Sequence, residues 1–556
     1  MNFKLAFTYE YCGKTIQRTM SSDENFELKF ENKDNQVKVI LNAKNEIKVK
    51  KFALRIPYKF YNNERIFVNG YQSWTDSREY TPYEKMDGLD RITDFVINLP
   101  LLDSTGLNRA GDETFYNFPH KNGVFYGFSY GYVRQGDKIN LFGSLDEHSG
   151  YTIIEFNTNN DCVYVKKDLE GVTFKGESEL LNLAALSGEY ESTFDKYFEM
   201  MGVKSRCDKR LSGYTTWYNY YSGVTEEIVR RDLDALSALD KKVDIFQIDD
   251  GYQAAIGDWL ITDSKKFPSG MKAVADEIHS KDMLAGLWLA PFAGTKNSKL
   301  FNEHPDWFIK DEKGKPYLTG PNWGTFYSLD IYNEDARAYI HHFFDVVLNE
   351  WGYDLVKLDF LYGACVLPMY NKTRGEVMCD AMDLLRECCV DKYILGCGVP
   401  LMPAFGKVDF CRIGADIHLE WKPRSYTHRE DVSTPHAINN AIFRRHLDGR
   451  AFMNDPDVFL LRENNIQMNF EQRKLLAKIN SLFGNVLFVS DNVSDYNEKQ
   501  LKAFLDTAFS NRATILSAAY KDERNIEIEY ILDGQHSKLI FDAYDGTTIG
   551  DFVVNE

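Results

Sequence analysis

The spacing of hydrophobic and polar residues changes about a third of the way along the chain. Up to about residue 195, runs such as FELKF, NQVKVILNA and YTIIEFNT are short, rich in β-forming residues and often alternating, and Gly, Asn and Asp turns separate them. Alternation with a period of two is typical of strands that bury one face. We therefore predict an antiparallel β domain and delimit it as residues 1–203.

After Lys204 the pattern becomes one of strand-length apolar runs, most of them separated by helical segments. About eight such runs occur: GYTTW, VDIFQID, MLAGLWLAPF, YDLVKLDF, YILGCG, VDFCRIG, RAFMND and NVLFVSD. Strands with two apolar faces are typical of a parallel sheet covered by helices. Eight repeats suit a closed (β/α)8 barrel, which we place at residues 204–510, with an open doubly wound sheet as the alternative.

The end of the chain returns to β alternation in NIEIEYIL and SKLIFDAY, which predicts a small C-terminal β domain at residues 511–556. The expected fold is thus multidomain, with β domains on either side of an α/β barrel.

Composition narrows the class of partner. Aromatic residues make up 14% of the chain, which supplies flat faces for ligand stacking. The net charge of −18 argues against nucleic acid and anionic membranes, because both attract positive surfaces. The nine cysteines are scattered and odd in number, and no apolar run is long enough to cross a bilayer. We expect a cytoplasmic protein, and the sequence leaves a homo-oligomer open.

Catalytic groups of a (β/α)8 barrel lie at the carboxyl ends of its strands. Polar and aromatic residues gather at the ends of the predicted strands: Trp217, Asp249, Asp250, Trp288, Lys357, Asp359, Cys397, Arg412, Asp416, Asn454 and Asp455. Carboxylates, aromatic rings and two cations are therefore expected at one rim.

Two carboxyl groups on opposite sides of one bond are the minimum equipment for glycoside hydrolysis. Asp359 ends an apolar strand, and Lys357 lies two residues earlier on the same strand face, where its charge favours an ionised nucleophile. A salt bridge between these two residues is the structural alternative. Asp416 follows a strand in the loop RIGAD and suits a general acid/base, although an Asp in a Gly-containing loop is more often a turn or cap.

Asp249 and Asp250 form an adjacent pair at the end of the second strand, where both side chains can reach the rim and accept bonds from sugar hydroxyls. A helix cap is the alternative. Trp74, Trp217 and Trp288 are candidates for stacking on a sugar, although a Trp in an apolar run is by default a core residue. Trp74 lies among polar residues in VNGYQSWTD and is the strongest of the three.

The histidines show no HExxH or His-x-His spacing, and the chain contains no GxGxxG or Walker A motif. We therefore predict no metal and no cofactor.

Several long segments resemble one family. They are VNGYQSW, TTWYNYY, FQIDDGYQAAIGDWL, GLWLAPF, FNEHPDWFIKD, KLDFLYGA, YILGCGVPLMPAFG, CRIGAD and FMNDPDVFLLRE. They run through most of the chain and resemble glycoside hydrolase family 36, the bacterial α-galactosidases, especially its compact members. The resemblance implies an N-terminal β-sandwich, a (β/α)8 barrel and a C-terminal β domain.

The resemblance also implies roles. Asp359 would be the nucleophile of a retaining mechanism and Asp416 the acid/base. Asp249 and Asp250 would bind O4 and O6 of galactose, and Lys357 and Arg412 would contact hydroxyls near the nucleophile. Cys397 and Gly398 would lie near O2, and Trp74 would close the pocket. The substrate would be a small oligosaccharide with a terminal α-galactoside.

Three alternatives stay open at this point. The chain could act on α-N-acetylgalactosaminides, although the GCG segment leaves little space for an N-acetyl group. It could transfer galactose to a sugar instead of water, through the same covalent intermediate. It could also be an inactive carbohydrate-binding protein, which the presence of both Asp359 and Asp416 disfavours.

Overall fold

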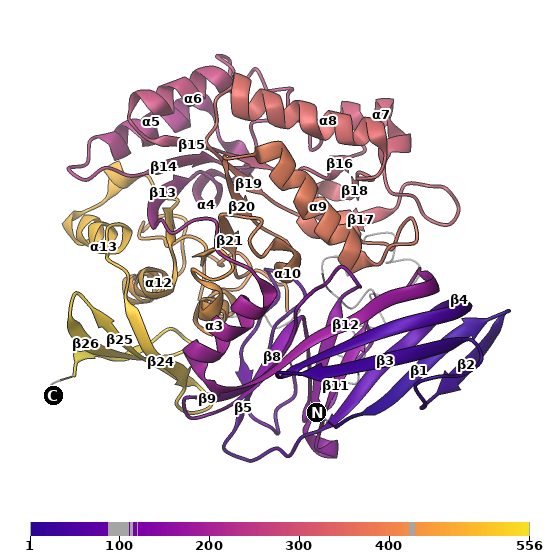
Figure 1. The fold of residues 1–556 in the computed structure, drawn as a ribbon. Coiled ribbons are helices and arrows are strands. Elements are labelled where there is room, and N and C mark those ends of the chain that lie inside the picture. Colours follow the sequence, from indigo (N-terminus) through magenta and orange to yellow (C-terminus); the bar gives the residue numbers. More distant parts are fainter. Residues whose placement is uncertain (1, 87–110, 112–114, 119, 422–428, 555–556) are drawn as a thin grey trace.

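The computed structural model describes residues 2–86, 111, 115–118, 120–421 and 429–554. These residues form a 12-stranded antiparallel sheet, an 8-stranded parallel sheet, a 3-stranded insertion and a 4-stranded terminal sheet. Figure 1 shows the first sheet below the helix-covered parallel sheet, with the terminal sheet beside it in yellow. This is the predicted order of a β-sandwich, an α/β barrel and a small β domain. The domain boundaries at 203/204 and 510/511 stay predictions.

The strands of the N-terminal sheet are β1 (Lys4–Tyr11), β2 (Lys14–Arg18), β3 (Phe26–Lys33), β4 (Gln36–Pro57), β5 (Arg65–Val68), β6 (Glu79–Tyr80), β7 (Val124–Phe128), β8 (Tyr130–Gln135), β9 (Lys138–Ser144), β10 (Thr152–Asn157), β11 (Cys162–Lys167) and β12 (Thr173–Glu189).

The long strand β4 organises this sheet. Its first half pairs with β3 and β12, and its second half pairs with β1 and β11. Its side chains alternate between buried and partly exposed over the first eight residues, as the sequence alternation predicts. β5 and β7, near the two ends of the pairing path, pack against each other, so the sheet folds back on itself as a sandwich.

The barrel strands are β13 (Leu211–Thr215), β14 (Ile245–Ile248), β15 (Leu284–Leu289), β19 (Leu355–Leu358), β20 (Tyr393–Gly396), β21 (Phe410–Arg412), β22 (Met453–Asp455) and β23 (Val486–Val489). All eight predicted runs are strands, and they pair in parallel in the order β22-β21-β20-β19-β15-β14-β13-β23. The edge strands meet through one backbone hydrogen bond of 2.8 Å, from Asn485 N to Asn454 O, so the barrel is nearly closed.

Helices connect the strands and cover the barrel, as Figure 1 shows for α5, α6, α8 and α9. Their bounds are α3 (Tyr190–Met201), α4 (Trp217–Tyr220), α5 (Glu226–Ser237), α6 (Met271–Ser280), α7 (Lys299–Glu303), α8 (Glu334–Asp345), α9 (Arg374–Cys389), α10 (Leu401–Ala404), α11 (Thr434–Phe443), α12 (Phe470–Phe483) and α13 (Glu498–Ala508). Side-chain caps begin several of them, such as Asn469 before α12. Within the described ranges, no helix is long and apolar enough to cross a membrane.

An insertion after β15 forms a small antiparallel sheet of β16 (Ala293–Thr295), β17 (Leu318–Gly320) and β18 (Phe326–Ser328). The turn between β17 and β18 contains Trp323, whose φ of 54° is left-handed. This backbone is unusual for a large side chain and directs the indole toward the barrel mouth, where it contacts Asp250.

The terminal sheet comprises β24 (Thr514–Tyr520), β25 (Asn525–Leu532), β26 (Gln535–Asp542) and β27 (Thr548–Val553). It packs on the last barrel helices. Tyr520 stacks on Phe443 of α11 with ring centroids 5.4 Å apart, and Gln472 of α12 donates to Asp545 O over 2.7 Å.

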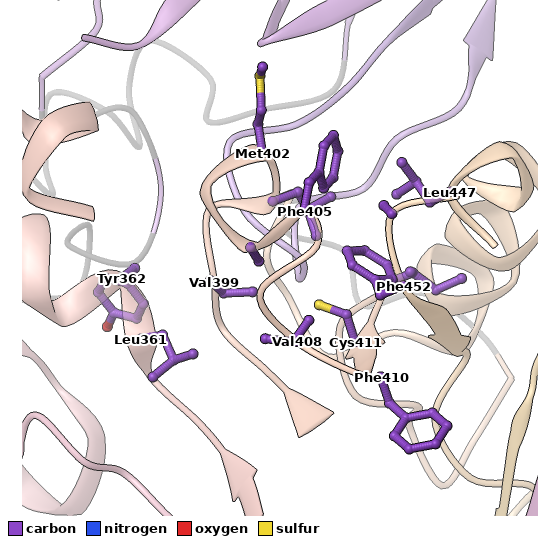
Figure 2. Close-up of a cluster of buried hydrophobic side chains, with 14 of the residues drawn as sticks. Leu361, Tyr362, Val399, Met402, Phe405, Val408, Phe410, Cys411, Leu447 and Phe452 are labelled. Atoms are coloured by element: carbon purple, nitrogen blue, oxygen red, sulfur yellow. The ribbon is translucent and has the colours of Figure 1, made fainter. Parts of the chain in front are cut away.

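A buried apolar cluster fills the space beside β20 and β21 (Figure 2). Val399, Met402 and Phe405 come from the segment after β20, and Phe452 packs against Phe405 with ring centroids 5.9 Å apart. The cluster anchors the chain that follows Cys397 and Gly398, so it supports one wall of the barrel mouth.

The buried Arg444 joins the N-terminal domain to the barrel. It donates to Asn69 Oδ1 (3.1 Å), Gln72 O (3.1 Å), Ser73 O (2.7 Å) and Ile413 O (2.8 Å). Three of these acceptors lie on the loop after β5, and the fourth precedes Asp416 by three residues. Ser73 N also donates to Val399 O over 2.9 Å. These bonds hold the N-terminal loop against the ends of β20 and β21.

Replacing Arg444 by Met should lower the stability of the protein by at least about 2 kcal/mol, because each buried acceptor left without a donor costs about 1–3 kcal/mol. The midpoint of thermal unfolding measures this change. The matched control is Arg524→Met, which removes the ion pairs of an exposed guanidinium with Asp542 and Asp545 and should leave the midpoint nearly unchanged. Equal midpoints for the two variants would contradict the role of Arg444.

Candidate active site

Asp359 lies directly after β19 and is buried, with 8% of its surface exposed. Trp288 Nε1 on β15 donates to its Oδ2 over 3.1 Å, and the Phe360 amide donates to its Oδ1 over 2.8 Å. Burial raises the pKa of Asp359, whereas the charge of Lys357 and hydrogen bonds from Cys397 and Trp288 lower it. The carboxylate is thus held in one orientation by neighbours that favour its ionised form.

Lys357 is also buried, but it forms its ion pair with Asp249 and not with Asp359, which is nearer in sequence. Lys357 Nζ lies 2.9 Å from Asp249 Oδ2, and Gln247 Nε2 donates to the same oxygen over 3.1 Å. The pair links β19 to the end of β14, and Lys357 acts on Asp359 through its charge. The alternative of a salt bridge with Asp359 is therefore wrong.

Asp250 follows Asp249 and is fixed by two donors. Gln253 Nε2 donates to Oδ1 over 2.5 Å, and Trp323 Nε1 donates to Oδ2 over 2.9 Å. Burial raises the pKa of Asp250, and these two hydrogen bonds oppose the shift. Both carboxylates of the pair therefore point into the barrel mouth, and neither acts as a helix cap.

Asp416 lies in the loop after β21 and keeps 32% of its side chain exposed. Arg412, the last residue of β21, is buried and donates from Nη2 to Asp416 Oδ1 over 3.0 Å. Its Nη1 lies 3.1 Å from Oδ1 of a second carboxylate, Asp457. Tyr218 donates to the other oxygen of Asp457. One guanidinium thus serves two carboxylates, one partly exposed and one buried.

Aromatic rings form a wall of the mouth. Trp74, from the N-terminal loop, donates from Nε1 to Cys397 Sγ over 3.3 Å and packs edge-on against Phe360 at 5.0 Å. Trp323 lies 4.6 Å from Phe360, and its indole also contacts Trp288 at 6.0 Å. The N-terminal domain and the inserted sheet therefore both contribute to the barrel mouth.

Trp217 is the first residue of α4, two residues past β13, and its ring meets Tyr221 at 5.1 Å. The charge of Asp416 contributes to the raised pKa of Tyr221. Trp217 therefore lies near Tyr221, on which the charge of Asp416 acts.

The structure thus brings the predicted site residues together at one end of the barrel, with Asn454 and Asp455 in β22 beside Asp457. Sequence analysis missed several contacting residues, among them Tyr218, Gln253, Trp323 and Asp457. Tyr218, Gln253 and Asp457 lie within quoted motifs, so proximity to a strand end could have indicated them. Trp323 lies in an insertion whose path no local pattern reveals. Among the described residues, no three His, Cys, Asp or Glu side chains are grouped to hold a metal ion.

A family model and curated relatives match part of the chain. Residues 203–377 match the family model described as Melibiase. The A type blood alpha-D-galactosamine galactosaminidase of Flavonifractor plautii is 32% identical over 182 residues, 31% of this chain and 16% of that protein. The alpha-galactosidase of Escherichia coli is 32% identical over 151 residues, 26% of this chain and 20% of that protein. These alignments therefore span a small part of the relatives' own length.

Solved structures match nearly the whole chain. TtGalA, an alpha-galactosidase from Thermus thermophilus in complex with stachyose, is 25% identical with a TM-score of 0.68, covering 90% of this chain and 99% of that one. The GH36 alpha-galactosidase AgaA of Geobacillus stearothermophilus is 13% identical with a TM-score of 0.60, covering 96% and 80%. Residues 203–377 are therefore similar to the melibiase family, and the chain has the fold of the glycoside hydrolase family 36 alpha-galactosidases.

Proposed function

We propose that the chain is a retaining α-galactosidase that releases terminal α-linked D-galactose from small oligosaccharides by double displacement. The observation that carries this proposal is the pair of unlike carboxyls at the barrel mouth. Asp359 is buried and held by Trp288 and the Phe360 amide, whereas Asp416 is partly exposed beside Arg412. They follow β19 and β21, which β20 separates.

In the first step, ionised Asp359 attacks the anomeric carbon while protonated Asp416 donates its proton to the departing glycosidic oxygen. The carbon–oxygen bond to the leaving group breaks, and a galactosyl ester of Asp359 forms. In the second step, Asp416 takes a proton from water, and the water oxygen displaces Asp359. The donors around Asp359 favour its carboxylate, both for attack and as the leaving group.

Asp249 and Asp250 support galactose as the sugar. Their oxygens are oriented by Lys357, Gln253 and Trp323, so each presents acceptors in a set geometry. We assign them to O4 and O6 of galactose. A carboxylate aimed at the axial O4 of galactose would be left without a hydrogen-bond partner by glucose, whose O4 is equatorial. TtGalA in complexes with stachyose and with p-nitrophenyl alpha-D-galactopyranoside supports this substrate class.

The relative from Flavonifractor plautii raises α-N-acetylgalactosamine as a second candidate sugar. The loop assigned to O2 is crowded in this chain. Trp74 lies over it, and a Cβ added at Gly398 would be 2.8 Å from Trp74 Cζ2. We therefore favour a free hydroxyl at C2. Transfer of galactose to a second sugar would use the same intermediate and is an outcome of the assays below.

We further propose that Lys357, Arg412, Cys397 and Gly398 surround the bound sugar, and that Trp74, Trp217 and Trp288 contact it. All nine cysteines are free thiols, which supports a reducing location such as the cytoplasm.

Asp359→Ala should abolish turnover, because the nucleophile is lost. Asp416→Ala should slow alkyl α-galactosides by about 10²–10⁴-fold but 2,4-dinitrophenyl α-galactoside far less in the first step, since an activated phenolate needs little protonation. Steady-state and burst kinetics with both leaving groups measure the difference.

Azide should give β-galactosyl azide with Asp359→Ala and α-galactosyl azide with Asp416→Ala. Equal losses on both substrates would contradict the assigned roles.

Asp250→Asn should reduce the preference for galactosides over glucosides in kcat/KM. An unpaired buried acceptor costs about 1–3 kcal/mol, so the ratio should fall by roughly tenfold to a few hundredfold. The matched control is Asp244→Asn, at the opposite end of the same strand, where the carboxylate bonds to Ser212. An unchanged ratio in Asp250→Asn would rule out its role in sugar selection.

The first sugar released should be α-configured. A retaining enzyme holds its two carboxyls about 5–5.5 Å apart, whereas an inverting enzyme needs about 6.5–9.5 Å to fit a water. Proton NMR at early time points distinguishes the anomers before mutarotation mixes them. A β-configured first product would show that Asp359 is not the nucleophile.

A further inference from the structure

Asp457 takes no direct part in the proposed reaction, yet it contacts three elements around the acid/base. It lies just after β22 and accepts from Tyr218 OH and from the Ile417 amide, the latter over 2.8 Å. Ile417 directly follows Asp416. The third contact is Arg412 Nη1, 3.1 Å from Asp457 Oδ1. The Asp457 carboxylate thus holds Ile417, which follows Asp416 in sequence, and Arg412, which contacts Asp416 in space.

The backbone of Asp457 is also unusual. Its φ of 79° is left-handed, a conformation that a non-glycine residue adopts at a cost and that persists where the surroundings hold it. Its amide donates to Asp455 Oδ1 over 2.9 Å. The side chain is buried, with 3% exposed. A buried carboxylate on such a backbone, with contacts to Arg412, Tyr218 and Ile417, does more than satisfy the strand end.

We propose that Asp457 is a positioning residue that holds Arg412 and Tyr218 beside Asp416 and so sets the pH range in which the general acid works. The inference rests on the proposed function and adds a residue to it. Asp457 does not touch the substrate in this scheme. It acts through the guanidinium that it shares with Asp416.

The charges around Asp457 and Asp416 give the direction in which the charge of Asp457 acts on Asp416. Arg412, Asp416, Asp455 and Tyr218 act on Asp457, and burial raises its pKa to about 7. Asp416 further interacts with Tyr221, Asp359 and Cys397.

Above about pH 7, Asp457 is ionised and shares the charge of Arg412. Below this pH Asp457 is neutral, and Arg412 acts on Asp416 alone. An ionised Asp457 therefore disfavours a second negative charge on Asp416, for two reasons. It offsets the cation, and it adds a like charge nearby.

Asp457→Asn keeps the shape of the side chain and removes this charge. The alkaline limb of kcat/KM for an alkyl α-galactoside should move to lower pH by roughly 1 unit, so that activity at pH 8 relative to pH 5 falls on the order of tenfold. Tyr218→Phe removes one donor to the carboxylate and should move the limb in the same direction by less. With 2,4-dinitrophenyl α-galactoside the limb should move little, because that leaving group needs little protonation.

The matched control is Asp491→Asn, a buried aspartate after β23 that pairs with Arg462 at 2.7 Å. It should lower the midpoint of thermal unfolding and leave the limb in place. A limb unmoved in both Asp457→Asn and Tyr218→Phe, with activity lowered equally at every pH, would overturn the proposal. If Asp457→Asn does not fold, the position of the alkaline limb in Tyr218→Phe alone tests the proposal. Lack of α-galactoside turnover by the unaltered protein would instead contradict the proposed function.

Discussion

Buried carboxylates outnumber buried cations at the mouth of this barrel, and the arrangement of the site follows from that constraint. The buried acids are Asp249, Asp250, Asp359, Asp455 and Asp457, and the cations beside them are Lys357 and Arg412. A buried charge without a partner costs several kcal/mol, so each cation is shared and the other acids take neutral donors. Lys357 pairs with Asp249 and acts on Asp359 by its charge, and Arg412 serves both Asp416 and Asp457.

This division of charge separates the two proposed catalytic roles. Asp359 has an indole and an amide as donors and a nearby ammonium, an environment that suits a carboxylate which must attack and leave. Asp416 is more exposed and has a guanidinium that a second acid partly neutralises. Two carboxyls of the same chemistry thus gain different properties from their neighbours.

The N-terminal domain is part of the site, because its loop after β5 forms one wall. Arg444 bonds to Gln72 O and Ser73 O on this loop and to Ile413 O beside the Asp416 loop. The same guanidinium therefore positions Trp74 and the Asp416 loop together. A barrel alone would expose the buried faces of both loops.

The sequence by itself determined the order of the domains, the eight barrel strands and the rim on which the polar residues gather. These features follow from local periodicity and from the rule that parallel strands end at one edge, so neighbours in the chain suffice. The sequence did not determine which side chains contact one another in the site. Lys357 pairs with Asp249 instead of Asp359, Trp323 reaches Asp250 through a left-handed turn, and Asp457 shares Arg412. These contacts join residues remote in sequence, and their distances depend on barrel closure and loop conformation, which only the tertiary structure decides.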